Sequence, residues 1–231
     1  MVDLNWQKYP VYKSSGVEWL GDIPEHWEVK RAKYVSKIFV PQRNKPELNL
    51  ESGLPWITMD DITNSTVNKS IYNYFVSELS ALKTGSKYLL SGSIIASCVG
   101  NFGVASVNTN SVIINQQLQA YIPKNINPWF LRYVVIISKT YFERVATVTT
   151  LLYVNKESFA EMPVPFPPLS EQQAIANFLD EKLAQIDDYI AKKQRMIKLL
   201  KEQKTVIINL AVTKGLNPDV PMKFSGIEWL G

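Results

Sequence analysis

A segment without glycine or proline, from Ser170 to Lys214, constrains the fold of this chain more than any other feature. It follows a cluster of prolines that excludes a helix just before it: Pro163, Pro165, Pro167 and Pro168. Ser170 is expected to cap a helix, with Gln173 completing a capping box, and Gly215 is expected to end it. The sequence therefore predicts one helix of roughly 44 residues, about 65 Å long at 1.5 Å per residue.

Apolar residues recur along this helix with alternating spacings of four and three. The seam consists of Leu179, Leu183, Ile186, Ile190, Lys193, Ile197, Leu200, Lys204, Ile207 and Ala211. A sustained period of 3.5 residues favours a coiled coil, and a helix buried against its own domain is the alternative. Phe178, Met196 and Ile208 widen the apolar stripe, which suits packing against more than one partner helix.

Charge is polarised along the same helix. The first half contains Glu171, Asp180, Glu181, Asp187 and Asp188 against Lys182 alone. The second half contains Lys192, Lys193, Arg195, Lys198, Lys201 and Lys204 against Glu202 alone. A parallel pair would place like charges together, whereas an antiparallel pair places acidic halves against basic halves. We therefore expect an antiparallel, two-fold pair.

The residues before the prolines indicate a mixed α/β domain. Helical spacing predicts a helix over Trp27–Phe39. Short β-branched runs predict strands over residues 54–59, 92–99 and 111–115. Gly100 and Gly103 indicate a tight turn, a helix is expected from Asn127 through Phe142, and residues 147–154 return to β character. The predicted fold class is an α/β (α+β) domain followed by a long α-helix that forms an antiparallel coiled coil.

A short motif occurs near both ends of the chain. S-G-V-E-W-L-G at Ser15–Gly21 returns as S-G-I-E-W-L-G at Ser225–Gly231, an offset of 225 − 15 = 210 residues. Solenoid repeats have periods of about 20–50 residues. The match therefore predicts one half of a duplicated protein, and the alternative is two similar surface turns without common origin.

Signals for catalysis and for metal or cofactor binding are few. The chain has one histidine, His26, and one cysteine, Cys98, and neither has a fixed partner in sequence, so no catalytic or metal-binding residues are predicted. P-loop and dinucleotide fingerprints are missing. We expect no cofactor, no enzymatic activity of the chain alone, no membrane span, and a cytoplasmic location. A net charge of +4 and a pI near 9.0 suit a polyanionic partner, but many ordinary proteins are equally basic.

Three motifs resemble one known family. They are Y-P-V-Y-K-S-S-G-V-E-W-L-G-D-I-P-E-H-W-E-V-K-R from Tyr9, G-S-I-I-A-S-C-V-G-N-F-G-V from Gly92, and P-V-P-F-P-P-L-S-E-Q-Q-A-I-A-N-F-L-D from Pro163. In this order they resemble the specificity subunits of type I restriction-modification systems. Such subunits usually contain two target-recognition domains, each followed by a long helix, and the two helices form an antiparallel coiled coil. This chain has one of each, so the resemblance implies a half-length form.

The resemblance implies a division into a target-recognition domain over residues 1–165, a long-helix region over residues 166–214, and a linker with the start of a second repeat over residues 215–231. The implied partners are double-stranded DNA, a second copy of the chain, and methyltransferase and restriction subunits. S-adenosylmethionine is expected on the methyltransferase subunit. A homodimer would read a bipartite palindromic target, one half-site per domain.

The DNA-contacting residues are predicted from side-chain chemistry, because asparagine and glutamine can read adenine and arginine or lysine can read guanine. The candidates are Arg43, Asn44, Lys45, Asn64, Asn68, Lys69, Asn101, Phe102, Asn108, Asn110, Gln116, Gln117, Thr147, Thr149, Thr150 and Tyr153. A second function stays open, that of a regulatory protein whose helix captures methyltransferase or full-length specificity subunits without reading DNA.

Overall fold

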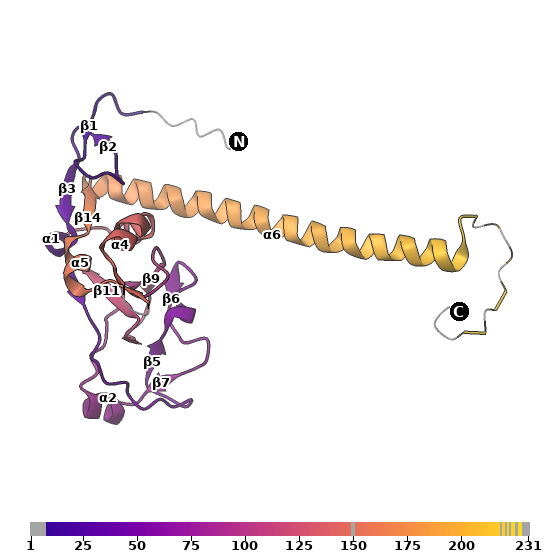
Figure 1. Ribbon diagram of the computed structural model, residues 1–231, viewed down its shortest axis with the longest axis horizontal. Coiled ribbons are helices and arrows are strands. Elements are labelled where there is room, and N and C mark those ends of the chain that lie inside the picture. Colours follow the sequence, from indigo (N-terminus) through magenta and orange to yellow (C-terminus); the bar gives the residue numbers. More distant parts are fainter. Residues whose placement is uncertain are drawn as a thin grey trace. The chain divides into compact units, whose positions relative to one another are not determined.

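The computed structural model describes residues 8–148, 151–217, 219, 221, 223–224 and 226–227. The chain divides into two compact units, one up to Asn177 and one from Phe178 (Figure 1). The strands are β1 (Tyr12–Ser14), β2 (Asp22–Pro24), β3 (Glu28–Arg31), β4 (Ser36–Phe39), β5 (Leu54–Ile57), β6 (Thr66–Val67), β7 (Phe75–Val76), β8 (Ile94–Ser97), β9 (Ala105–Asn108), β10 (Ile113–Ile114), β11 (Leu118–Pro123), β12 (Thr147–Val148), β13 (Leu152–Tyr153) and β14 (Pro163–Phe166). The helices are α1 (Ala32–Val35), η1 (Met59–Asp61), α2 (Glu78–Thr84), α3 (Pro128–Ile137), α4 (Lys139–Val145), α5 (Lys156–Glu161) and α6 (Leu169–Lys214).

The first unit is built on a five-stranded sheet with the order β4-β11-β8-β9-β6, in which only β6 and β9 run parallel. Both faces of this sheet are buried. Ile94 and Tyr121 pack on one face with helix α3, whereas Ile95 and Ala120 pack on the other face. Neighbouring residues of a strand point to opposite faces, so burial of both faces explains the continuous apolar run in β8.

The predicted strands at residues 54–59, 92–99 and 111–115 are confirmed as β5, β8 and β10, and the predicted return to β character is confirmed by β12 and β13. The predicted helix over Trp27–Phe39 is wrong. These residues form β3, one turn of α1 and β4, because β3 pairs with β14 and β4 pairs with β11. Pairing partners distant in sequence therefore override a local helical spacing.

Helix α6 agrees with the predicted long helix and ends at Lys214, just before Gly215. Ser170 is not its cap, because the helix already begins at Leu169 and the amide of Gln172 donates to the carbonyl of Pro168. The capping box is therefore wrong as well, since the Gln173 side chain accepts from Asn127 instead. The predicted helix through Phe142 is interrupted at Ser138, which separates α3 from α4.

The motif Ser15–Gly21 forms the loop between β1 and β2. The amide of Ser15 donates to the carbonyl of Gly21 at 3.1 Å, which closes the loop. Trp19 packs against the core and Glu18 forms an ion pair with Arg144 at 2.8 Å. In the second copy of the motif, Gly226 has φ +76°, close to the +68° of its counterpart Gly16.

A smaller sheet, β10-β5-β7, lies with α2 at the end of the first unit away from β3 and β14 (Figure 1). Trp56, Val76 and Ile113 form its buried cluster. Antiparallel pairing of Leu54 with Val76 brings the residue before β5 against β7. That residue is Gly53, which has φ +130°, a conformation that residues other than glycine avoid.

Replacing Gly53 by alanine is expected to destabilise the protein by about 1–3 kcal/mol through backbone strain and overpacking. An added Cβ would lie 2.2 Å from the carbonyl oxygen of Val76, so β5 and β7 would have to separate. The control is Gly92→Ala, where φ is +83° but nothing lies within 4 Å of the added Cβ. Urea unfolding measures both variants, and equal losses would contradict a role for the close approach to Val76.

Candidate functional site

The register of the five-stranded sheet brings several predicted DNA-contacting segments to one end. Strands β4 and β8 finish at this end, and β6, β9 and β11 start there. We call it the loop end of the sheet. The segments that leave or enter the strands at this end are residues 40–45, 64–65, 98–104 and 115–117. The predicted contacts at the loop end are Arg43, Asn44, Lys45, Asn64, Asn101, Gln116 and Gln117.

Hydrogen bonds join two of these segments. Nε2 of Gln116 donates to the carbonyl oxygens of Gln42 at 3.1 Å and Arg43 at 3.3 Å. Nδ2 of Asn115 donates to Oε1 of Gln117 at 3.3 Å. The Gln116 amide group therefore fixes the backbone that presents Arg43, and the side chains of Arg43, Asn44 and Lys45 are exposed.

The hairpin β12–β13 lies against the glycine turn at the same end. The amide of Gly100 donates to the carbonyl of Leu152 at 2.9 Å, and Val99 forms a β-bridge with Tyr153. Thr147 pairs with Tyr153 across the hairpin. The structure therefore brings the predicted contacts Thr147, Tyr153 and Asn101 together, whereas Thr149 and Thr150 lie outside the described residues.

Three further predicted contacts lie elsewhere. Asn68 and Lys69 follow β6 and Asn110 follows β9, at the end of the sheet opposite the loop end. The amide of Thr109 donates to the carbonyl of Val67 at 3.0 Å, which holds these two segments together. Their side chains are exposed but are not gathered with those at the loop end.

Two predicted contacts are corrected by burial. Phe102 is 2% exposed and its ring lies 6.1 Å from that of Phe142, so it belongs to the core. Asn108 is fully buried, and its side chain accepts from the amide of Ser93 and donates to two carbonyls. A buried side chain whose polar groups are all bonded within the protein cannot reach a base. Polar chemistry alone does not distinguish such structural residues from exposed ones.

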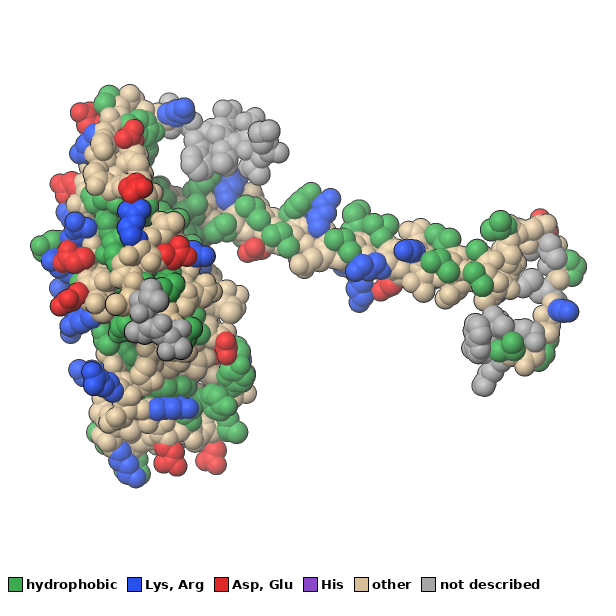
Figure 2. Space-filling view, viewed as in Figure 1, with side chains coloured by type: hydrophobic (Ala, Val, Ile, Leu, Met, Phe, Trp, Pro, Cys, Tyr) green, Lys and Arg blue, Asp and Glu red, His purple; other side chains and the backbone are tan. Residues whose placement is uncertain are grey.

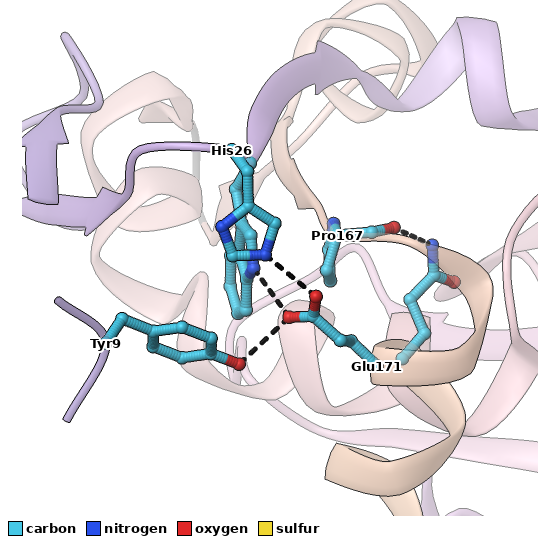
Figure 3. A network of polar contacts seen from close by, with 6 residues as sticks. Tyr9, His26, Pro167 and Glu171 are labelled. Atoms are coloured by element: carbon cyan, nitrogen blue, oxygen red, sulfur yellow. Dashed lines mark hydrogen bonds and ion pairs between the residues drawn. The ribbon is translucent and has the colours of Figure 1, made fainter. Parts of the chain in front are cut away.

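Sequence reasoning missed a polar network around Glu171 in the first turn of α6 (Figure 3). Its Oε1 accepts from Nε2 of His26 at 2.8 Å, and its Oε2 accepts from Nε1 of Trp27 at 2.9 Å and from the hydroxyl of Tyr9 at 2.9 Å. An ionised carboxylate only accepts, so Nε2 of His26 must carry a proton. The acid partner of His26 lies 145 positions away in the chain, so the residues around His26 gave no sign of it.

Pairing of β3 with β14 explains how residues so distant in sequence meet. Phe166 at the end of β14 pairs with Glu28 at the start of β3, so Trp27 lies beside the chain that enters α6. Figure 1 shows β3 and β14 next to the beginning of α6. No local sequence signal could have found this network, because nothing local indicates which strands pair.

The Glu171 carboxyl is affected by two opposing influences. Burial acts to raise its pKa, but hydrogen bonds from His26, Trp27 and Tyr9 outweigh burial and hold the pKa below the ordinary glutamate value. Because the folded-state pKa is depressed, the network contributes stability above the ordinary pKa. That contribution is lost as pH falls through the folded-state value.

In the second unit, the apolar side chains of α6 are exposed along the helix, as Figure 2 shows. The exposed fractions of Leu183, Ile186, Ile190, Ile197, Leu200 and Ile207 run from 42% to 57%. Helical spacing places the seam on one stripe, and its pairing in a coiled coil stays a prediction. Met196, Leu199 and Leu200 also line a shallow surface hollow with Lys192 and Arg195.

Among the described residues, no helix has the length and apolar character to cross a membrane. Within the same ranges, the side chains of His, Cys, Asp and Glu do not gather in threes that could bind a metal ion.

Comparisons with known proteins identify relatives of this chain. The sequence model of the family described as "Type I restriction modification DNA specificity domain" matches residues 24–199. The type I restriction enzyme MjaIX specificity subunit of Methanocaldococcus jannaschii is 23% identical over 210 residues, which are 87% of this chain and 46% of that protein. This chain spans about half the length of the curated relatives it matches.

Solved structures share the fold. A chain from a structure of the type I R-M system, described in terms of complex assembly and conformational transition, aligns with a TM-score of 0.73 at 21% identity, over 89% of this chain and 49% of that chain. The HsdS subunit from Thermoanaerobacter tengcongensis aligns with a TM-score of 0.64 at 20% identity, over 89% of this chain and 49% of that chain. With one recognition domain followed by one long helix, the chain belongs to the family of type I restriction-modification specificity subunits.

Proposed function

We propose that this chain is the DNA sequence-recognition component of a type I restriction-modification complex and is not itself catalytic. The first unit reads one half-site of duplex DNA, and α6 pairs antiparallel with α6 of a second copy. The homodimer then reads a bipartite palindromic target. The observation that carries the proposal is the exposed apolar stripe of α6.

The stripe supports pairing on physical grounds. Leucine and isoleucine side chains lie along a helix that has no core of its own, and soluble proteins rarely leave a long contiguous apolar surface uncovered. An antiparallel arrangement places the acidic half of one helix, around Asp187, against the basic half of the other, around Lys198.

DNA reading is supported by the loop end of the sheet. Exposed Arg43 and Lys45 offer positive charge for phosphates, and exposed Asn101 and Gln117 offer amide groups for base edges. The loops are held by the hydrogen bonds of Gln116, so these side chains start from a fixed backbone. A fixed backbone lowers the entropy lost on binding.

The remaining partners follow from the family. Methyltransferase subunits, which would carry S-adenosylmethionine, are proposed to dock on Phe178, Met196 and the apolar positions of α6 outside the seam. Restriction subunits would join through that complex. The wider stripe supports this assignment, because Met196 and Leu199 are both 55% exposed.

Selection from a library of random-sequence duplexes tests the proposal with the chain as it exists. We expect enrichment of two identical half-sites in inverted orientation with a constant spacer. Enrichment of no sequence, together with binding of a full-length specificity subunit, would instead support a regulatory protein that captures partners without reading DNA.

Lys45→Ala is expected to weaken binding to the selected duplex about three- to tenfold and to reduce the slope of log affinity against log salt by about one. The physical reason is the loss of one phosphate contact and its released counterion. Lys124→Ala is the matched control, because Lys124 is also exposed but follows β11 at the opposite end of the sheet. Fluorescence anisotropy over a salt series measures both, and equal changes would argue against the loop end as the interface.

A further inference from the structure

A half-buried glutamine, Gln42, joins the loop after β4 to the turn that follows α2, residues 85–88. We call these residues the α2 turn. Nε2 of Gln42 donates to the hydroxyl oxygen of Ser86 at 2.7 Å, and its Oε1 accepts from the backbone amide of Lys87 at 3.3 Å. The carbonyl of Gln42 accepts from Gln116 at 3.1 Å. The α2 turn is therefore bonded to a segment of the loop end.

Strand pairing places the α2 turn at the same end independently. Leu89 and Val112 form an antiparallel β-bridge, in which each amide donates to the carbonyl of the other residue at 2.8 and 3.0 Å. In an antiparallel pair, residues before Leu89 lie beside residues after Val112. The chain after Val112 runs through β10 to residues 115–117 at the loop end. The α2 turn therefore lies beside that end of the sheet.

Two lysines outside the predicted set of DNA contacts lie in or next to the α2 turn. Lys83 is in the last turn of α2, Lys87 follows the helix, and both are exposed. A cation in the last turn of a helix offsets the negative end of the helix dipole, which explains Lys83. The dipole does not explain Lys87, which lies beyond the C-cap residue Gly85. The second lysine therefore needs a reason other than helix stability.

The two lysines enlarge a group of cations that have no acidic partner. They join exposed Arg43 and Lys45 at the loop end, and within the described part of the chain none of these four side chains forms an ion pair. By contrast, Lys33 forms an ion pair with Glu161. Like charges on linked segments repel one another, and a bound polyanion removes this repulsion.

Acidic side chains lie at the other end of α2. Glu78 is in the first turn of the helix. The hydroxyl of Ser80 donates to the carbonyl of Glu47 at 2.9 Å, which places Glu47 beside that turn. The end of α2 that carries the lysines is therefore positive. In Figure 2, Lys and Arg side chains lie around the part of the first unit where Figure 1 places α2.

We propose that Lys83 and Lys87 bind phosphates of the DNA backbone, and that Gln42 is the positioning residue that holds the α2 turn in register with the base-reading loop. The inference rests on the proposed function, because it extends the surface that reads the half-site. A lysine ammonium is a flexible point charge, which suits a phosphate whatever the neighbouring base. Such contacts fix the position of the protein on the duplex and carry no sequence information.

Binding of the full chain to the selected duplex over a salt series tests the inference. For the double variant Lys83→Ala and Lys87→Ala, we expect the affinity at low salt to fall about ten- to a hundredfold. The slope of log affinity against log salt should decrease by about 1.8, because two phosphate contacts no longer release counterions. The ratio of affinities for the selected duplex and a mismatched duplex should change by less than about twofold.

The matched control is the double variant Lys37→Ala and Lys124→Ala. Both lysines are exposed, and among the described residues neither forms an ion pair. They lie where β4 begins and β11 finishes, at the end of the sheet opposite the loop end. The control removes the same net charge, so an effect of charge alone would appear equally in both double variants. We expect the control to keep the wild-type salt slope.

Phosphate ethylation locates the contacts on the duplex. Ethylation of the phosphates that Lys83 and Lys87 bind should weaken binding of the wild type and of the control. The same modifications should have no effect on the variant that lacks the two lysines. This readout separates a direct contact from a general loss of affinity, because the modified position is read from the DNA.

A double-mutant cycle tests the role of Gln42. Gln42→Ala should cause part of the affinity loss of the lysine variant, because the α2 turn loses its anchor, and Ser86→Ala should act in the same direction. Gln42→Ala should cause no further loss when Lys83 and Lys87 are already alanine. The cycle is clean because Lys87 bonds Gln42 through its backbone amide, which the substitution keeps.

The outcomes separate the inference from the proposed function. A reduced salt slope and lost ethylation effects in the lysine variant alone support the phosphate contacts. Equal losses in the control, or altered preference at one base position, overturn them and leave the proposed function standing. A full additional loss from Gln42→Ala in the variant without the lysines overturns its positioning role. A wild-type chain that binds no duplex overturns the proposed function and this inference together.

Discussion

Replacing both Ile190 and Ile197 by lysine is expected to abolish pairing of α6 and to convert a dimer into a monomer. Burial of one isoleucine contributes about 1.5–3 kcal/mol, and a symmetric pair loses four such side chains. The expected loss is about 6 kcal/mol or more, or roughly four orders of magnitude in the dimer dissociation constant. Light scattering over a concentration series should give a mass near twice 26.3 kDa for the wild type and near 26.3 kDa for the variant.

The first unit should keep its stability in this variant, because Ile190 and Ile197 are 46% and 54% exposed in the single chain and lie outside that unit. The control is the double substitution Ala184→Lys and Ala191→Lys, which adds the same charge at exposed positions off the seam. It should remain dimeric. A wild-type mass that stays near 26.3 kDa at every concentration would rule out the homodimer and require another partner for the stripe.

The long helix could be predicted from sequence because its signals are local. The segment Ser170–Lys214 contains neither glycine nor proline. The prolines that precede it and Gly215 that follows it lie within a few residues of the helix ends. Strands β5, β8 and β10 could be predicted for the same reason. The helix predicted over Trp27–Phe39 failed because the competing interaction, pairing with β14 and β11, comes from residues more than 70 positions away.

The candidate site could be predicted only in part. Side-chain chemistry selected Arg43, Gln116 and Tyr153, which the register of the sheet then gathers at one end. Chemistry alone could not separate exposed Asn101 from its buried neighbour Phe102, because burial depends on which helix covers the turn. The Glu171 network was missed for a similar reason, since its donors become neighbours only through the pairing of β3 with β14.

Phe102→Ala is expected to destabilise the protein by about 3–5 kcal/mol, the usual loss when a buried phenylalanine is truncated. A series of ring contacts runs through the core from Phe102. The centroid of its ring lies 6.1 Å from that of Phe142, and the Phe142 centroid lies 5.0 Å from that of Phe159. The Phe159 ring in turn stacks on Tyr121, with 5.3 Å between the centroids. Loss of the first ring leaves a cavity that the rigid neighbours cannot fill. Urea unfolding followed by tryptophan fluorescence measures the change.

Asn101→Ala and Phe102→Ala are expected to separate DNA reading from fold stability, the two properties to which the glycine turn contributes. Asn101 is exposed at the loop end, so its truncation should change the free energy of unfolding by less than about 0.5 kcal/mol. If its amide group reads a base, affinity for the selected duplex falls by about 1–3 kcal/mol, with relaxed preference at one position. Phe102→Ala should show the reverse pattern under conditions where it remains folded: low stability with unchanged base preference. A Phe102 variant of full stability that had lost base preference would instead place the ring in the DNA interface.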